Sequence, residues 1–201
     1  MEQVLSFLGL PYDMTLLMLS ILPDLRLQYI ILKMDTHFLI LMGVSGSGKT
    51  TVGKAISSKL GWDFYDADDF HPQENITKMD TGMPLNDSDR APWLASLHDL
   101  IESCLTKSRP GVLACSALKE CYRQKLLEGN DGVQLIYLKG SYDLIWSRMS
   151  MRKDHYMKPE MLQSQFEALE EPSDALTVDI SLSVDEIVKV VLQYVGNMQH
   201  L

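Results

Sequence analysis

Apolar runs and amphipathic stretches alternate along most of the chain, and this alternation predicts the fold class. The runs at 37–42, 111–116 and 133–138 are short and almost wholly apolar, which is typical of strands buried on both faces. Residues 90–107 and 183–198 instead carry apolar side chains at helical spacing. Because strands and helices alternate, we expect an α/β domain in which helices cover both faces of a parallel sheet.

The remaining segments extend the same pattern. An aromatic-rich run at 62–68 and an apolar run at 175–180 complete the expected sheet as its second and fifth strands. Asp87 or Ser88 is expected to cap the helix at 90–107, and Ser141 to cap a later helix. The closing helix is expected to face inward with Val184, Ile187, Val188, Val191 and Val195. Further helices are expected at 51–60, 72–79, 118–127, 141–152 and 158–169.

A glycine-rich loop lies between the first strand and the first helix. Its sequence, GVSGSGKT, fits the phosphate-loop pattern G-x-x-x-x-G-K-[ST] at every fixed position. Glycines allow a tight turn that brings several backbone N–H groups to one phosphate, at the N-terminus of a helix. Lys49 reaches the β- and γ-phosphates, and the Thr50 hydroxyl is a ligand for Mg²⁺. The residues expected to bind ATP are Gly43, Val44, Ser45, Gly46, Ser47, Gly48, Lys49, Thr50 and Thr51.

Polar side chains follow the predicted strands at their carboxyl ends, where parallel sheets bind ligands. This places the phosphate loop, Asp66–Asp68 and Ser116–Lys119 along one rim. Alternate residues of a strand share a side, so we expect Asp66 and Asp68 to face the phosphate loop together. Phosphoryl transfer to an alcohol needs a carboxylate for the hydroxyl proton, and often another for Mg²⁺; capping of the next helix is the alternative role. His71 is either a donor to a substrate hydroxyl or a capping or core side chain.

Basic residues are expected on the acceptor side of this rim. Arg90 lies at the start of a long amphipathic helix, and its guanidinium offers a bidentate fork for a carboxylate. A surface ion pair with Asp87 or Asp89 is the alternative for Arg90. Lys119 and Arg123 lie one helical turn apart, and each is either an acceptor ligand or a solvated helix residue.

A basic segment at 148–158 separates two predicted helices. A lid that closes over a transferring phosphate needs such charge, so we expect a mobile lid at about 152–165. A solvated surface is the alternative for a bare run of charges.

Composition narrows the classes of function. The chain has 201 residues, which suits one domain with a sizeable core, and Trp93 is expected in that core. The net charge of −9 argues against broad nucleic-acid binding, which needs a basic surface. Cys104, Cys115 and Cys121 lack zinc-site spacing and fit the reducing cytoplasm, with Cys115 expected in the core.

Residues 1–33 are apolar, but prolines and charged residues interrupt them. Their longest clean stretch, 14–22, is far shorter than the roughly 18 residues that span a bilayer. The basic leading region of a signal peptide is missing. We therefore expect a poorly ordered extension at 1–33 and a kinase domain at 34–201, with an extra helix packed on the domain as the alternative.

Several segments together resemble the gluconokinases, small P-loop carbohydrate kinases of the shikimate and nucleoside-monophosphate kinase type. The resemblance runs over about residues 37–198. The phosphate loop alone fits many nucleotide-binding families, whereas DADDFHP, NDSDR and CSALK together are much more selective. In chain order the matching segments are GVSGSGKTTVG, DADDFHP, NxxKM, PLNDSDRAPWL, CSALKECYR, YLKG and MLQSQFEALEEP.

The resemblance implies a Mg²⁺-dependent reaction of ATP with D-gluconate to give ADP and 6-phospho-D-gluconate, which feeds the pentose phosphate pathway. It also implies the P-loop kinase fold, with a five-stranded parallel sheet and a mobile lid, and a homodimer. By the same resemblance Lys49, Asp68 and Arg152 are catalytic, and Thr50 and Asp66 hold the metal. The resemblance also implies that Asp68 orients the acceptor hydroxyl and that Arg90, with Lys119 or Arg123 nearby, grips the carboxylate and hydroxyls of gluconate. With His71 as a donor to a substrate hydroxyl, these are the expected substrate ligands.

Two other functions remain open from the residues. One is a kinase for a different small acceptor, such as shikimate, a nucleotide or another sugar acid. The other is a nucleotide-dependent regulatory protein, which the presence of both Asp66 and Asp68 disfavours.

Overall fold

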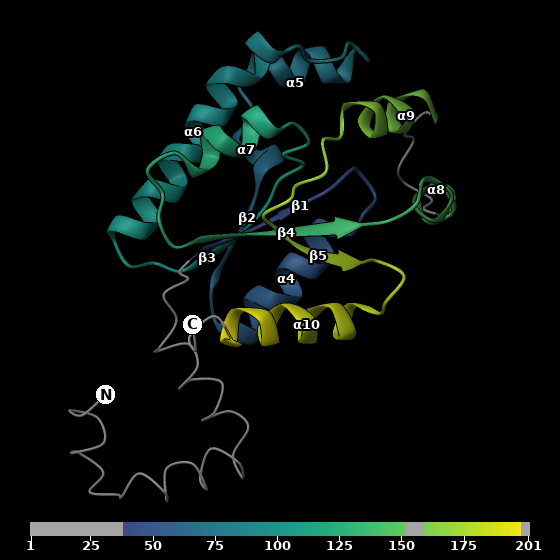
Figure 1. Ribbon diagram of the computed structural model, residues 1–201. Coiled ribbons are helices and arrows are strands. Elements are labelled where there is room, and N and C mark those ends of the chain that lie inside the picture. The colour runs from purple at the N-terminus through teal and green to yellow at the C-terminus, as the bar shows by residue number, and fades with distance from the viewer. Residues whose placement is uncertain (1–37, 152–158, 198–201) are drawn as a thin grey trace, which may run out of the picture.

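The computed structural model of the protein describes residues 38–151 and 159–197. Within them the chain forms one sheet with helices on both faces (Figure 1). The extension expected at 1–33 and the part of the expected lid at 152–158, which contains Arg152, lie outside the described residues. Within the described ranges, no helix combines the length and apolarity needed to cross a bilayer.

Five strands form a single parallel sheet, which confirms the expected architecture. The order is β2-β3-β1-β4-β5, and every neighbouring pair is parallel. Parallel neighbours need crossover connections, and helices supply them. All carboxyl ends therefore share one edge, with β1 at the centre. The strands are β1 (Phe38–Met42), β2 (Asp63–Asp66), β3 (Gly111–Ala114), β4 (Val133–Lys139) and β5 (Leu176–Asp179).

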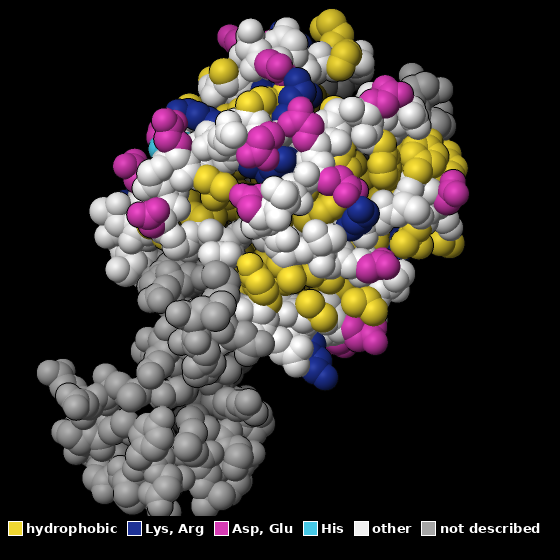
Figure 2. Space-filling model, in the orientation of Figure 1, with side chains coloured by type: hydrophobic (Ala, Val, Ile, Leu, Met, Phe, Trp, Pro, Cys, Tyr) yellow, Lys and Arg dark blue, Asp and Glu magenta, His cyan; other side chains and the backbone are white. Residues whose placement is uncertain are grey.

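Helices α4 and α10 cover one face of the sheet, and α6 and α7 cover the other (Figure 1). Helices α8 and α9 lie on the side toward which the arrowheads of β4 and β5 point. Acidic and basic side chains lie side by side over α6 and α7, in the view of Figure 2. The helices are α4 (Lys49–Leu60), α5 (Gln73–Asp80), α6 (Asp87–Thr106), α7 (Glu120–Leu127), α8 (Tyr142–Ser150), α9 (Pro159–Ala168) and α10 (Val184–Asn197), with a short 3₁₀ helix η1 (Ala67–Phe70).

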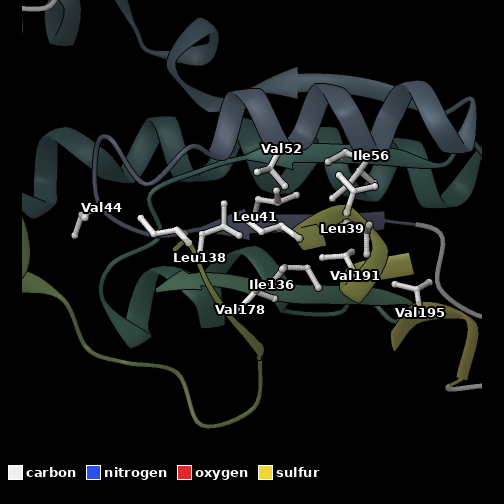
Figure 3. Packing of buried hydrophobic residues seen from close by; sticks show 14 of the residues in the cluster. Leu39, Leu41, Val44, Val52, Ile56, Ile136, Leu138, Val178, Val191 and Val195 are labelled. Atoms are coloured by element: carbon white, nitrogen blue, oxygen red, sulfur yellow. The ribbon is translucent and has the colours of Figure 1, made fainter. Parts of the chain in front are cut away.

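Strand β1 separates the core into two layers, and all five of its residues are fully buried. Leu39 and Leu41 join the cluster closed by α4 and α10 (Figure 3). Phe38, Ile40 and Met42 join the cluster under α6 and α7. The pleat turns successive side chains to opposite faces, so a strand covered on both sides must be apolar at every position.

Two details at the ends of elements differ from the sequence prediction. The second strand ends at Asp66 rather than continuing to Asp68, because the chain turns into η1 there. The Asp66 side chain caps η1 by accepting from the Asp68 N–H at 3.3 Å. Val184 is exposed instead of facing inward, since it is the first residue of α10 and precedes the buried residues of that helix.

The cap of α6 is also a different residue from either one predicted. Asn86, not Asp87 or Ser88, accepts from the Asp89 N–H at 2.9 Å, and Asp89 accepts from the Asn86 N–H at 3.0 Å. This reciprocal capping box satisfies two backbone donors that a helix start leaves free. The predicted cap at Ser141 is confirmed, since its hydroxyl accepts from the Leu144 N–H.

Ile56→Ala tests the layer between α4 and α10. Ile56 is fully buried in the cluster of Figure 3, so truncation leaves a cavity. We expect the free energy of unfolding to fall by about 2–5 kcal/mol, measured by urea denaturation. Ser58→Ala, at an exposed position of the same helix, is the matched control and should change it by less than about 0.5 kcal/mol. Equal losses in the two variants would contradict this packing.

Candidate active site

The phosphate loop makes the turn from β1 into α4. Gly43, Gly46 and Gly48 have φ angles of 140°, 82° and 95°, a region that side chains rarely adopt. At Gly43 an added Cβ would also lie 2.8 Å from the Leu138 carbonyl oxygen. The two fixed glycines of the motif are therefore required by the shape of the turn itself.

Lys49 is the first residue of α4, and its side chain folds back onto the loop. Its Nζ donates to the carbonyl oxygens of Gly43 at 3.0 Å and Val44 at 3.1 Å. Burial lowers the pKa of Lys49, while the nearby carboxyls of Asp66 and Asp68 act in the opposite direction. The half-buried Lys49 cation can exchange these carbonyl oxygens for phosphate oxygens with a gain in charge pairing.

The two predicted metal ligands lie together at the rim. Thr50 lies in the first turn of α4, and Asp66 is the last residue of β2. The Thr50 hydroxyl donates to Asp66 Oδ2 at 2.9 Å. Hydroxyl and carboxylate oxygens are the ligands that Mg²⁺ prefers, so this pair fits a magnesium ion.

Asp68 reaches the same place from η1, so the predicted strand geometry for this residue is wrong. Its side chain is open to solvent on one side, yet the surrounding protein removes enough water to raise the pKa of its carboxyl. The charge of Asp66 raises this pKa further, and the charges of Lys49 and His71 lower it. A carboxylate with a raised pKa is suited to accepting a proton from an alcohol.

His71 packs against the core with one face of its ring. The ring stacks on Trp93 with centroids 4.6 Å apart and planes 9° apart, and Trp93 is buried as expected. Burial lowers the pKa of His71, against the effect of Asp68. The charge of Arg90 also lowers this pKa. The packing alternative is confirmed for this residue by the stacking on Trp93, and its Nδ1 lies 3.4 Å from Asn75 Nδ2.

Four side chains from α6 and α7 form a charged cluster, which we call the acceptor cluster. Lys119 Nζ donates to both carboxylate oxygens of Asp87 at 2.9 Å, and the Tyr122 hydroxyl donates to Asp87 Oδ1. Arg90 Nη1 lies 3.8 Å from the same oxygen. The hydrogen bonds from Tyr122 and Lys119 lower the pKa of Asp87. Arg90 and Lys119 are therefore neighbours, as predicted, and the predicted ion-pair alternative for Arg90 is also present.

Arg123 has a different position from the one predicted. It is 1% exposed, and Nη1 donates to the carbonyl oxygens of Ala117 at 3.1 Å and Leu118 at 3.0 Å. Nε and Nη2 both donate to Glu120. Because all three nitrogens are used by the protein, Arg123 braces the loop before α7, and the role of acceptor ligand does not fit its position.

Sequence reasoning gave no role to several residues that contact the site. Tyr122 lies within a matched motif, but no spacing predicts its contact with Asp87. For Asp87 the sequence predicts only a helix cap or an ion pair with Arg90, and the structure adds its contacts with Lys119 and Tyr122. Gln165 accepts from the Ser45 N–H of the phosphate loop at 2.7 Å, across 120 positions of sequence. The only signal for Gln165 was its place inside the MLQSQFEALEEP segment.

The chain is similar to known kinases over most of its length. The sequence model of the shikimate kinase family matches residues 45–195. A probable gluconokinase of Mus musculus is 46% identical over 175 residues, covering 77% of this chain and 95% of the relative. The thermoresistant gluconokinase of Escherichia coli strain K12 is 46% identical over 158 residues, covering 77% and 90%.

Solved structures give the same picture. A gluconokinase from Sinorhizobium meliloti 1021 matches with a TM-score of 0.74 at 39% identity, over 83% of this chain and 95% of that one. A shikimate kinase from Acinetobacter baumannii in complex with shikimate matches with a TM-score of 0.52 at 18% identity, over 83% and 96%. The second match shows a shared fold alone.

Asp68→Asn should stabilise the fold at neutral pH. The pKa of Asp68 is about 3.9 in the unfolded chain and is raised in the fold. The free energy of unfolding therefore falls as the pH rises from the unfolded pKa to the folded pKa. The asparagine variant lacks this penalty, and its gain in unfolding free energy should shrink as pH falls toward about 4. Urea denaturation at both pH values measures it, with Asp69→Asn as the neighbouring control. A variant less stable than the parent at pH 7 would refute the assignment.

Proposed function

Because the chain belongs to the shikimate kinase family of P-loop kinases and, within it, to the gluconokinases, we propose that it transfers the γ-phosphoryl group of ATP to D-gluconate. The products are ADP and 6-phospho-D-gluconate. The observation that carries the proposal is the position of Asp68. Its backbone N–H donates to Asp66 Oδ1 at 3.3 Å, and the other carboxylate oxygen of Asp66 accepts from the Thr50 hydroxyl beside the phosphate loop.

The phosphate loop supplies the donor half of the site. Its backbone N–H groups and the helix N-terminus hold the phosphates of ATP, and Lys49 exchanges its carbonyl partners for phosphate oxygens. Thr50 and Asp66 are the residues that would hold Mg²⁺. When bound, the ion neutralises negative charge on the phosphates.

The acceptor cluster supplies the other half. Arg90 and Lys119 are the cations available for the carboxylate of gluconate, and Arg90 offers it a bidentate fork. Both cations now pair with the Asp87 carboxylate. The carboxylate of a bound acid would pair with the same two cations. A monocarboxylic sugar acid therefore matches the chemistry of this cluster.

Transfer proceeds by in-line displacement. The acceptor hydroxyl oxygen attacks the γ-phosphorus, and a new O–P bond forms while the bond to the β,γ-bridging oxygen breaks. Asp68 takes the hydroxyl proton, which its raised pKa favours, and ADP leaves with the bridging oxygen. Lys49 compensates the negative charge on the phosphates during transfer. The predicted lid cation Arg152 belongs to this proposal as a further stabiliser of that charge.

We extend the proposal to a homodimer in the cytoplasm, as the gluconokinase resemblance implies. Free thiols at Cys104, Cys115 and Cys121 support a reducing compartment. Cys104 and Cys115 are buried, and burial raises the pKa of Cys115 to about 12, which makes it an inert core residue.

A coupled assay of ADP release tests the substrate. Purified protein with Mg²⁺ and ATP is compared on gluconate, shikimate, glycerate, idonate and nucleoside monophosphates. We expect strong turnover with gluconate alone, because the gluconokinases are relatives that the chain matches over most of its length. Lys49→Ala is the control that should remove turnover, since it deletes the cation that binds the phosphates. Turnover with another acceptor but not with gluconate would overturn the substrate assignment.

Asp68→Asn tests the assignment of the base. The variant should lower kcat by about 100-fold or more while the KM for ATP stays within a fewfold of the parent value. In the parent, kcat/KM should fall as pH drops through the raised pKa of Asp68, because protonation removes the base. This acid limb should be absent from the residual activity of the variant. An unchanged kcat would identify a different carboxylate as the base.

A further inference from the structure

Helix α9 is attached directly to the phosphate loop. The Oε1 atom of Gln165, near the end of this helix, accepts from the Ser45 N–H at 2.7 Å. Gln165 is half-buried, and Leu162 of the same helix is fully buried in the core. Gln165 takes one backbone N–H of this loop and leaves the others for phosphate, so it holds the shape of the donor loop without replacing the phosphate.

The segment that follows α9 is attached to the acceptor side. The Glu170 N–H donates to the Leu118 carbonyl oxygen at 2.9 Å, and Glu170 Oε2 accepts from the Glu120 N–H at 2.5 Å. These bonds hold the loop that carries Lys119 into α7. Arg123 braces the same loop from the inside through the Leu118 carbonyl and the Glu120 carboxylate.

A third attachment fixes the end of this segment to the sheet. Lys139 Nζ donates to Glu171 Oε2 at 2.7 Å, and the Tyr137 hydroxyl lies 3.4 Å from Glu171 Oε1. Tyr137 and Lys139 belong to β4, next to the central strand. Residues 165–171, which we call the strap, therefore run from the phosphate loop to the acceptor loop with a fixed point on the sheet.

We propose that Gln165 and Glu170 make the strap a link between the two substrate sites, so that nucleotide on the phosphate loop tightens acceptor binding at the Arg90–Lys119 side. Gln165 is a positioning residue for the donor loop and Glu170 for the acceptor loop. The inference rests on the proposed function for the identity of the acceptor. It goes beyond that function because it assigns the coupling to two named side chains.

The sign of the coupling follows from the cost of ordering the strap. A ligand that orders the phosphate loop also orders the strap through the Gln165–Ser45 contact. Both strap contacts are formed in the structure, so a ligand that stiffens the phosphate loop stiffens the acceptor loop through them, and the second ligand pays less conformational entropy on binding. Thermodynamic linkage requires the acceptor to tighten nucleotide binding by the same factor.

Calorimetry on the full chain measures this factor. Gluconate is titrated into the protein alone and into protein saturated with Mg²⁺ and a non-hydrolysable ATP analogue. In the parent we expect nucleotide to tighten gluconate binding by about fivefold or more. In Gln165→Ala and in Glu170→Ala the factor should fall below about twofold. The double variant should lose no more than either single variant, because both act through one link.

Gln163→Ala is the matched control. Gln163 lies on the same helix, is exposed, and hydrogen-bonds to Glu167 within that helix. It should keep the parent factor. A parent factor of one, or equal factors in Gln165→Ala and the parent, would overturn the link even if gluconate turnover is normal.

Gln165→Glu separates positioning from a merely structural role. The substitution keeps the length of the side chain and its acceptor oxygen, but it adds a negative charge beside the Ser45 N–H. We expect it to weaken nucleotide binding more than Gln165→Ala does, because like charges repel at this distance. Equal nucleotide affinity in the two variants would show that position 165 does not act on the phosphate site.

Hydrogen exchange tests the link without any acceptor. Adding nucleotide alone to the parent should slow amide exchange at 118–123, which lies on the acceptor side. Gln165→Ala should still bind nucleotide but lose this remote protection. If gluconate is not a substrate, the proposed function fails while this measurement still decides the link. Remote protection that persists in Gln165→Ala would refute it.

Discussion

The burial of β1 on both faces fixes the centre of the sheet and, with it, the start of the phosphate loop. All five residues of the strand are fully buried, and it pairs with β3 on one side and β4 on the other. The chain passes from this fixed strand straight into the phosphate loop, whose Gly43 N–H donates to the Ser116 carbonyl oxygen at the end of β3. The loop is therefore held in shape by the core, which is what a site that binds anions through backbone N–H groups requires.

Holding the charged side chains of the candidate active site in the fold lowers the free energy of unfolding. The burial of apolar side chains in the two hydrophobic layers must offset this loss. Burial lowers the pKa of Lys49, and partial burial beside Asp66 raises the pKa of Asp68. Each shift means that the charged form is less stable in the fold than in water. The acceptor cluster is arranged differently, since Asp87 is paired with cations at an open surface and its pKa is lowered. The charges beside the phosphate loop are thus destabilised by burial, whereas the charge of Asp87 is stabilised by its cations. This arrangement suits a site in which the carboxylate of the acceptor takes the place of Asp87 beside Arg90 and Lys119.

Contacts between distant segments assemble the two halves into one site. Thr50 and Asp66 join α4 to β2, Lys119 and Asp87 join α7 to α6, and Gln165 joins α9 to the phosphate loop. The shared carboxyl edge of a parallel sheet makes this possible, because every strand delivers its following loop to the same side. The strap adds a connection between the phosphate loop and the start of α7, through Gln165 at one end and Glu170 at the other.

The five strands, their alternation with helices and the phosphate loop can all be predicted from the sequence, whereas the metal pair of Thr50 and Asp66 was implied by the resemblance to gluconokinases. The first three features follow from short-range periodicity and from a motif whose spacing is set by backbone geometry. Three placements could be known only from the folded chain: Asp68 lies on η1, Arg123 bonds to the loop before α7, and Gln165 accepts from the Ser45 N–H. The physical reason is that several partners compete for each polar group, and the group bonds to the one that the fold brings nearest. That partner often belongs to a segment far away in the sequence, so no local pattern predicts the contact.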